Sequence, residues 1–92
     1  MIVLDTCALI WLATTPAALS SHAAEAIRRD AGALAVVPIS AWEIAVKVGS
    51  GRLLMHGDFE PLEWYEQVRD RYGMLELLLD ARTLCAAAAL PL

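Results

Sequence analysis

Three short runs of apolar residues alternate with longer segments of helical periodicity, and this alternation constrains the fold most strongly. The runs cover residues 2–4, 34–37 and 75–79, and the first two are apolar throughout. Continuous apolar runs are typical of strands that are buried on both faces, as in parallel sheets. Strands that alternate with helices predict an α/β fold with a parallel sheet and helices over its faces.

The intervening segments carry start and stop signals of helices. Ser, Thr and Asp side chains accept hydrogen bonds from the free amides of a first helical turn, whereas Gly and Pro favour helix ends. The predicted helices cover residues 7–14, 22–30, 41–49, 60–72 and 81–89. The fourth carries an apolar stripe that we expect to lie in the core, formed by Trp64, Tyr65, Val68 and Tyr72.

The composition describes a small, acidic and apolar chain. It has 92 residues, 59% of them hydrophobic, and a formal net charge of −4, so a single domain over 1–92 is expected. The apolar excess indicates a partner surface or a missing part of the fold. The negative charge argues against binding nucleic acid by phosphate contacts alone, so a polyanionic substrate would require a bound cation.

The cysteines and the N-terminal segment indicate the cellular compartment in which the protein is expected. Cys7 and Cys85 are far apart and form no Cys-x-x-Cys pair, which favours reduced thiols with a packing role in the cytoplasm. Asp5 interrupts the N-terminus, and the apolar run 7–13 is too short to cross a bilayer. We therefore expect a cytoplasmic protein without a membrane partner.

The segment "ISAWEIAVKVGSG" at 39–51 contains a single carboxylate, Glu43, which has two interpretations. Ser40 followed by Glu43 matches a capping box, in which the two side chains satisfy free amides at a helix start. Alternatively, Glu43 holds a group that performs chemistry. Asp5 also has two interpretations: it is either a helix N-cap, shared with Thr6, or a carboxylate that binds a ligand.

The predicted topology bears on that choice, because ligands of open parallel sheets bind beyond the carboxyl ends of the strands. Asp5 follows the first predicted strand, and Glu43 lies in the first turn after the second. If these strands are neighbours, the two carboxylates share one edge of the sheet and repel each other unless a cation intervenes. Mg²⁺ and Mn²⁺, which prefer oxygen ligands, fit such a site.

The stretches "MIVLDTCALIWLA", "VVPISAWEIAVKVGSGRL" and "YGMLELLLD" resemble the PIN-domain ribonucleases of the VapC group, the toxins of type II toxin–antitoxin systems. The resemblance spans residues 1–92 and implies a three-layer α/β/α fold with a parallel sheet. It also implies RNA hydrolysis with Mg²⁺ or Mn²⁺ and a cognate antitoxin as partner. Asp5 and Glu43 match the metal-binding catalytic carboxylates, with Thr6 and Ser40 as supporting hydroxyls.

The resemblance also shows a departure at the C-terminus. Family chains continue beyond Leu90 and Pro91 with a His-x-Asp-Pro-Phe-Asp-Arg-like segment that adds a catalytic acid and further strands, and this segment has no counterpart here. We therefore expect a partial PIN domain with weak or no hydrolysis. An alternative is a non-catalytic fragment that binds antitoxin. The first strand, central in the family, would have a free edge, which predicts a homodimer or other self-association.

The remaining charged residues have ordinary interpretations. Lys47 is expected to pair with Glu43 one turn earlier or to be solvated, and a phosphate contact is the sharper alternative. Asp80 is explained as a helix cap, Glu76 as an outward residue of a strand, and His22 and His56 as surface histidines. Glu60, Glu63 and Glu66 form the polar side of a helix.

Overall fold

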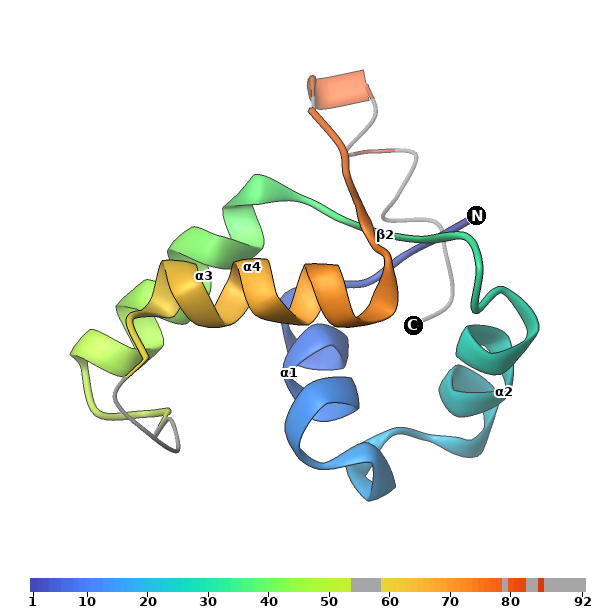
Figure 1. Ribbon diagram of the computed structural model, residues 1–92, viewed down its shortest axis with the longest axis horizontal. Coiled ribbons are helices and arrows are strands. Elements are labelled where there is room, and N and C mark those ends of the chain that lie inside the picture. Colours follow the sequence, from blue (N-terminus) through green and yellow to red (C-terminus); the bar gives the residue numbers. More distant parts are fainter. Residues whose placement is uncertain (54–58, 79, 83–84, 86–92) are drawn as a thin grey trace.

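The computed structural model describes residues 1–53, 59–78, 80–82 and 85 (Figure 1). Helices and strands alternate along this part of the chain, which confirms the predicted α/β class. The predicted helix 81–89 lies mostly outside the described residues. The elements are β1 (Ile2–Val3), α1 (Thr6–Thr14), the 3₁₀ turn η1 (Pro16–Ala18), α2 (Ser21–Arg29), β2 (Leu34–Val36), α3 (Pro38–Gly49), α4 (Pro61–Tyr72) and β3 (Leu75–Glu76).

The three strands form a parallel sheet in the order β1-β2-β3. In the register of the sheet, Val3 lies opposite Ala35, and Val36 lies opposite Glu76. β2 is central, and its three residues are buried. Because β1 and β2 are parallel neighbours, their carboxyl ends meet at one edge, as the sequence interpretation required.

Local signals set most helix boundaries. Asp5 caps α1 by accepting a 2.7 Å hydrogen bond from the Ala8 amide, and Ser20 caps α2 by accepting from Ala23 at 3.0 Å. α4 ends at Gly73, which adopts the left-handed conformation at φ 61°. Glycine takes that conformation without the steric cost that a Cβ atom imposes. These boundaries lie within one residue of the predicted ones.

The start of α3 differs from the prediction, and the capping box is wrong. The helix begins at Pro38, three residues before the predicted start, and no side chain caps it. Proline is favoured at a first helical position because its φ is already helical and it has no amide to satisfy. Ser40 therefore lies within the first turn, where its amide donates to the Val37 carbonyl at 3.0 Å. The Ser40 and Glu43 side chains are then free to make contacts outside the helix.

The core joins the sheet to the helices. Its most deeply buried side chains include Leu4, Leu9, Val36, Ile44 and Tyr65. The predicted aromatic stripe of α4 belongs to this core, since Tyr65 and Val68 are buried and Trp64 and Tyr72 pack against it while half-buried. Tyr72 also links α4 to α1 through a 3.5 Å contact from its hydroxyl to the Leu12 carbonyl.

The cysteines do not pack in this core, which corrects the role expected for them. Cys7 and Cys85 are both free and exposed. In the first turns of α1 the inward positions belong to Thr6 and Ala8, Leu9 and Ile10, so the side chain of Cys7 faces solvent. None of the helices in the described part of the chain combines the length and apolarity needed to cross a membrane.

β1 is an edge strand among the described residues. The amides of Ile2 and Leu4 donate to the carbonyls of Ala33 and Ala35 at 3.0 and 2.9 Å. Because backbone groups alternate along a strand, the amide of Val3 faces the side away from β2. The side chains of Ile2 and Leu4 are buried, so the open feature of this strand is its backbone rather than its apolar surface.

Candidate functional site

Asp5 and Thr6 occupy the junction between β1 and α1. Asp5 is exposed, and its Oδ1 atom accepts the amide of Ala8 in the first turn of α1. Thr6 is the first residue of the helix and is only 5% exposed. A buried hydroxyl requires a hydrogen-bond partner, because leaving it unpaired costs free energy. The partners of Thr6 come from α3.

The Thr6 hydroxyl joins α1 to α3. Its Oγ1 atom donates to Glu43 Oε1 at 2.8 Å and lies 2.9 Å from Ser40 Oγ. Ser40 is 1% exposed, and Glu43 is half-buried. Ser40 and Glu43 are three positions apart in α3 and so share one face of that helix. The three side chains define the Thr6–Ser40–Glu43 cluster, which connects residues 34 and 37 positions apart in sequence.

The four site residues predicted from the sequence therefore lie at the same sheet edge. Asp5 precedes Thr6 directly at the end of β1, and Ser40 and Glu43 lie in α3, which begins two residues after β2. The 2.8 Å bond from Thr6 fixes one oxygen of the Glu43 carboxylate, and the Ala8 amide fixes one oxygen of Asp5. Each carboxylate has a second oxygen for which no protein donor is found in the described part of the chain.

The donor set at this edge consists of carboxylate and hydroxyl oxygens. Oxygen ligands of this kind suit Mg²⁺ and Mn²⁺, whereas soft metals prefer thiolate or imidazole. Within residues 1–53, 59–78, 80–82 and 85, no group of three or more His, Cys, Asp or Glu side chains is arranged to hold a metal ion. Two carboxylates from Asp5 and Glu43 would thus leave most positions around a cation to water.

Of the two ordinary roles expected of Lys47, an ion pair with Glu43 or a solvated charge, the ion pair is not formed. The ion pairs between described residues join Arg28 to Glu25, and Arg69 to Glu66 and Glu76. Lys47 lies half-buried in the last turn of α3, where a positive charge interacts favourably with the carboxyl end of the helix. Its possible phosphate contact remains a prediction.

A second cluster of polar side chains, missed by the sequence interpretation, surrounds Glu76 on β3. The buried Tyr65 hydroxyl donates to Glu76 Oε2 at 2.6 Å, and the Arg69 guanidinium lies 3.9 Å from the same oxygen. Arg69 also bonds Glu66 at 2.9 Å and lies over the Tyr65 ring. Glu76 therefore points toward α4, and the expectation of an outward Glu76 was wrong. A strand of two residues shows no alternation from which its inner face could be read.

Burial and the hydrogen bond to Glu76 both raise the pKa of Tyr65 above the ordinary tyrosine value. Burial disfavours the charged phenolate, and the neighbouring carboxylate disfavours it further by repulsion. The Arg69 guanidinium opposes this shift only in part. Tyr65 thus acts as a hydrogen-bond donor to Glu76 over the ordinary pH range and ties α4 to β3.

Comparisons of this chain with protein-family models, with curated proteins and with solved structures find no match.

Proposed function

We propose that this chain is a PIN-like, metal-dependent endoribonuclease of reduced activity, with a three-layer α/β/α arrangement and a cytoplasmic location. The observation that carries the proposal is the 2.8 Å contact between Thr6 and Glu43. It brings the residue after Asp5 against the glutamate of α3, at the shared carboxyl edge of two parallel strands. This edge is where open parallel sheets bind their ligands.

Asp5 and Glu43 are the residues that would hold Mg²⁺ or Mn²⁺. Their second oxygens are available, and the negative charge of the two side chains suits a divalent ion. When bound, such a cation polarises a phosphoryl oxygen and lowers the pKa of a coordinated water. It also supplies the positive charge that a chain of net charge −4 needs next to an RNA phosphate.

The protein's own contribution is to fix the two carboxylates. The Thr6 hydroxyl donates to one oxygen of Glu43 and also contacts Ser40, so the glutamate is held from α1. The Ala8 amide holds Asp5 at the opening of α1. Because no third acid joins the pair among the described residues, a cation would be loosely coordinated. Weak hydrolysis follows from that open coordination.

An alternative function is binding of an antitoxin without RNA cleavage. It is favoured by an apolar stripe on the outer face of α3, where Ile39, Trp42 and Val46 are exposed and Trp42 is 62% exposed. Apolar groups at this helical spacing are typical of a face that meets another helix. We also propose self-association through the edge of β1 that pairs with no other strand among the described residues, and the oligomeric state in solution tests it.

The deciding experiment is RNA cleavage by the purified 92-residue chain with Mn²⁺, compared with Asp5→Asn and Glu43→Gln. Asparagine caps a helix about as well as aspartate, and glutamine can still accept the Thr6 hydrogen bond. Both variants therefore remove charge while preserving the hydrogen bonds that shape the site. Asp70→Asn, an exposed residue near the end of α4, is the matched control.

The nuclease proposal expects manganese-dependent cleavage that both site variants abolish and Asp70→Asn retains. Mn²⁺ binding, followed by the paramagnetic broadening of nuclear magnetic resonance signals around Thr6, provides a readout independent of turnover. Binding without cleavage would favour the antitoxin-binding alternative. Cleavage that persists in both site variants, or the absence of broadening near Thr6, would overturn the assignment of Asp5 and Glu43.

A further inference from the structure

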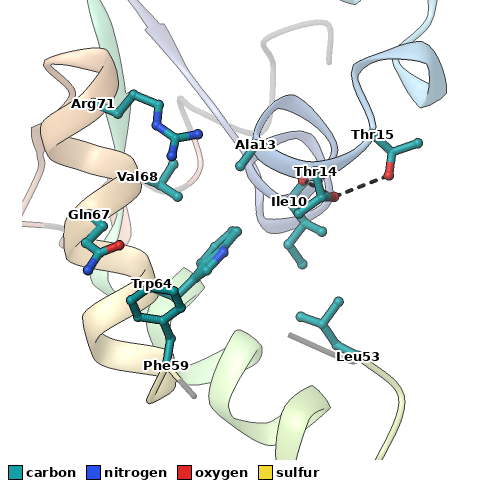
Figure 2. Close-up of a pocket in the computed structure, with 10 residues that line it drawn as sticks. All are labelled: Ile10, Ala13, Thr14, Thr15, Leu53, Phe59, Trp64, Gln67, Val68 and Arg71. Atoms are coloured by element: carbon teal, nitrogen blue, oxygen red, sulfur yellow. Dashed lines mark hydrogen bonds between the residues drawn. The ribbon is translucent and has the colours of Figure 1, made fainter. Parts of the chain in front are cut away.

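A pocket of about 500 Å³ lies between α1 and α4 (Figure 2). Its volume falls within the range of small-molecule sites, roughly 300–1,000 Å³. The α4 side contributes Trp64, Gln67, Val68 and Arg71, which recur at helical spacing and so share one face. The α1 side contributes Ile10 and neighbouring residues of its second half.

The pocket has a mixed lining of apolar side chains and of polar ones from both helices, the polar ones being Thr14, Thr15, Gln67 and Arg71. Figure 2 shows Trp64 projecting from α4 into the space before α1, with Phe59 beside it and Leu53 opposite. Ile10 borders the same space from α1. A large indole next to aliphatic side chains offers a flat apolar wall, against which an aromatic or aliphatic body can be buried.

Arg71 supplies the charge of this pocket. It is exposed, and its guanidinium extends toward the gap between the helices (Figure 2). No lining residue carries a negative charge, and Arg71 forms no ion pair with any residue that the structure describes. The Gln67 amide lies one turn earlier on the same face and can donate a further hydrogen bond. Guanidinium groups favour planar carboxylates, which they bind through paired hydrogen bonds.

We infer that this pocket binds a small organic monocarboxylate with a flat apolar body. The body lies along Trp64 and Ile10, and the carboxylate is held by Arg71 with Gln67 as a second donor. The inference does not depend on the proposed nuclease function. The pocket uses the second half of α1, whereas the Thr6–Ser40–Glu43 cluster uses its first turn.

The test titrates 2-naphthoate into the full chain and follows the tryptophan indole signals by ¹H–¹⁵N nuclear magnetic resonance. 2-Naphthamide, of the same shape without charge, is the matched ligand. We expect 2-naphthoate to shift the Trp64 signal at millimolar concentration or below, and the Trp42 signal on α3 to stay unchanged. Asp5→Asn should bind the ligand as well as the original chain does.

Arg71→Gln should weaken 2-naphthoate binding roughly fivefold, as expected for an exposed charge pair, and leave 2-naphthamide binding unchanged. Arg29→Gln, an exposed arginine of α2, is the control and should change neither. Ala13→Leu narrows the pocket and should weaken both ligands. Three results would overturn the inference: no shift of Trp64, equal affinity for acid and amide, or a Trp64 signal that moves on dilution. The last would show that a second copy occupies the pocket.

Discussion

Glu43 and Glu76 are two half-buried carboxylates that differ in their neighbours. Each accepts a short hydrogen bond from a buried hydroxyl, at 2.8 Å from Thr6 and at 2.6 Å from Tyr65. Glu76 also has the guanidinium of Arg69 at 3.9 Å. Glu43 has no cationic side chain paired with it within the part of the chain that the structure describes.

This difference separates a structural carboxylate from a candidate ligand. Removing a carboxylate from water is unfavourable unless hydrogen bonds and an opposite charge compensate. The protein itself supplies both at Glu76, and the result is a closed link between α4 and β3. At Glu43 it supplies the hydrogen bond alone, and a second acid, Asp5, lies at the same edge of the sheet. The missing positive charge is what the proposed divalent cation would provide.

The largest expected effect is on Mn²⁺ affinity. Glu43→Gln should weaken Mn²⁺ binding at least roughly tenfold, whereas Glu76→Gln should leave it unchanged because Arg69 occupies the place of a cation. Isothermal titration calorimetry on the folded variants measures both. Equal losses for the two variants would remove the distinction between the carboxylates.

The next largest effect is on the free energy of unfolding, through the cluster of Tyr65, Arg69 and Glu76. Tyr65→Phe should lower the free energy of unfolding by about 2 kcal/mol, because Glu76 loses a charge-assisted hydrogen bond. Urea denaturation followed by circular dichroism provides the value. Tyr72→Phe is the control, since its hydroxyl makes only a 3.5 Å contact. If Tyr65→Phe and Tyr72→Phe lose similar free energies of unfolding, the bond to Glu76 stabilises the fold no more than the long contact of Tyr72 does.

A smaller loss of stability is expected at the Thr6–Ser40–Glu43 cluster. Thr6→Val keeps the shape of the side chain but removes its hydroxyl, and should cost about 1 kcal/mol. The cost is smaller than for Tyr65 because the hydrogen bond to Glu43 is longer, at 2.8 Å against 2.6 Å for the bond to Glu76. Thr6→Ser should restore most of the stability in the same urea experiment. If serine fails to do so, packing of the threonine methyl group rather than the hydroxyl explains the loss.

The raised pKa of Tyr65 predicts a loss of stability in alkali. Because the folded chain holds the phenol more tightly protonated than the unfolded chain does, this contribution is complete below the ordinary tyrosine pKa of about 10. It is lost progressively as the pH rises above that value. Urea unfolding between pH 8 and pH 11 should show the decline, and Tyr65→Phe should reduce its slope. An unchanged slope in the variant would assign the decline to other groups.

The smallest effect is expected at Lys47. Lys47→Gln should change the free energy of unfolding by less than about 0.5 kcal/mol, because the side chain makes no ion pair with Glu43. If Lys47 contacts a phosphate, the slope of the logarithm of RNA affinity against the logarithm of salt concentration should be smaller by about one in Lys47→Gln. Fluorescence anisotropy at several salt concentrations measures this slope. No change would leave Lys47 as a solvated charge.

Features encoded locally could be predicted from the sequence. The apolar runs located the three strands of the described part of the chain, and the N-cap signal at Asp5 located the start of α1. These signals are readable because a cap or an apolar run acts through residues only a few positions away. The edge that Asp5 and Glu43 share also followed from the order of strands and helices, once neighbouring parallel strands were assumed.

Features that depend on contacts between distant residues could not be predicted. The Ser40–Glu43 spacing matched a local motif, but Pro38 competed for the helix start, and the two side chains bond Thr6 instead. The Tyr65–Glu76 bond spans eleven positions around a turn and has no sequence signature. The pocket beside Trp64 depends on how far α1 and α4 stand apart. Such distances result from packing of the whole core.

The left-handed turn at Gly73 has a consequence for how the chain tolerates insertions and deletions. It leaves only Gly73 and Met74 between the end of α4 and the start of β3. This short connection fixes which side chains of β3 face α4. One residue added there would turn Glu76 away from α4 and present a leucine to Arg69, because strand side chains alternate. Length changes in this connection should therefore be far less tolerated than the many that surface loops accept.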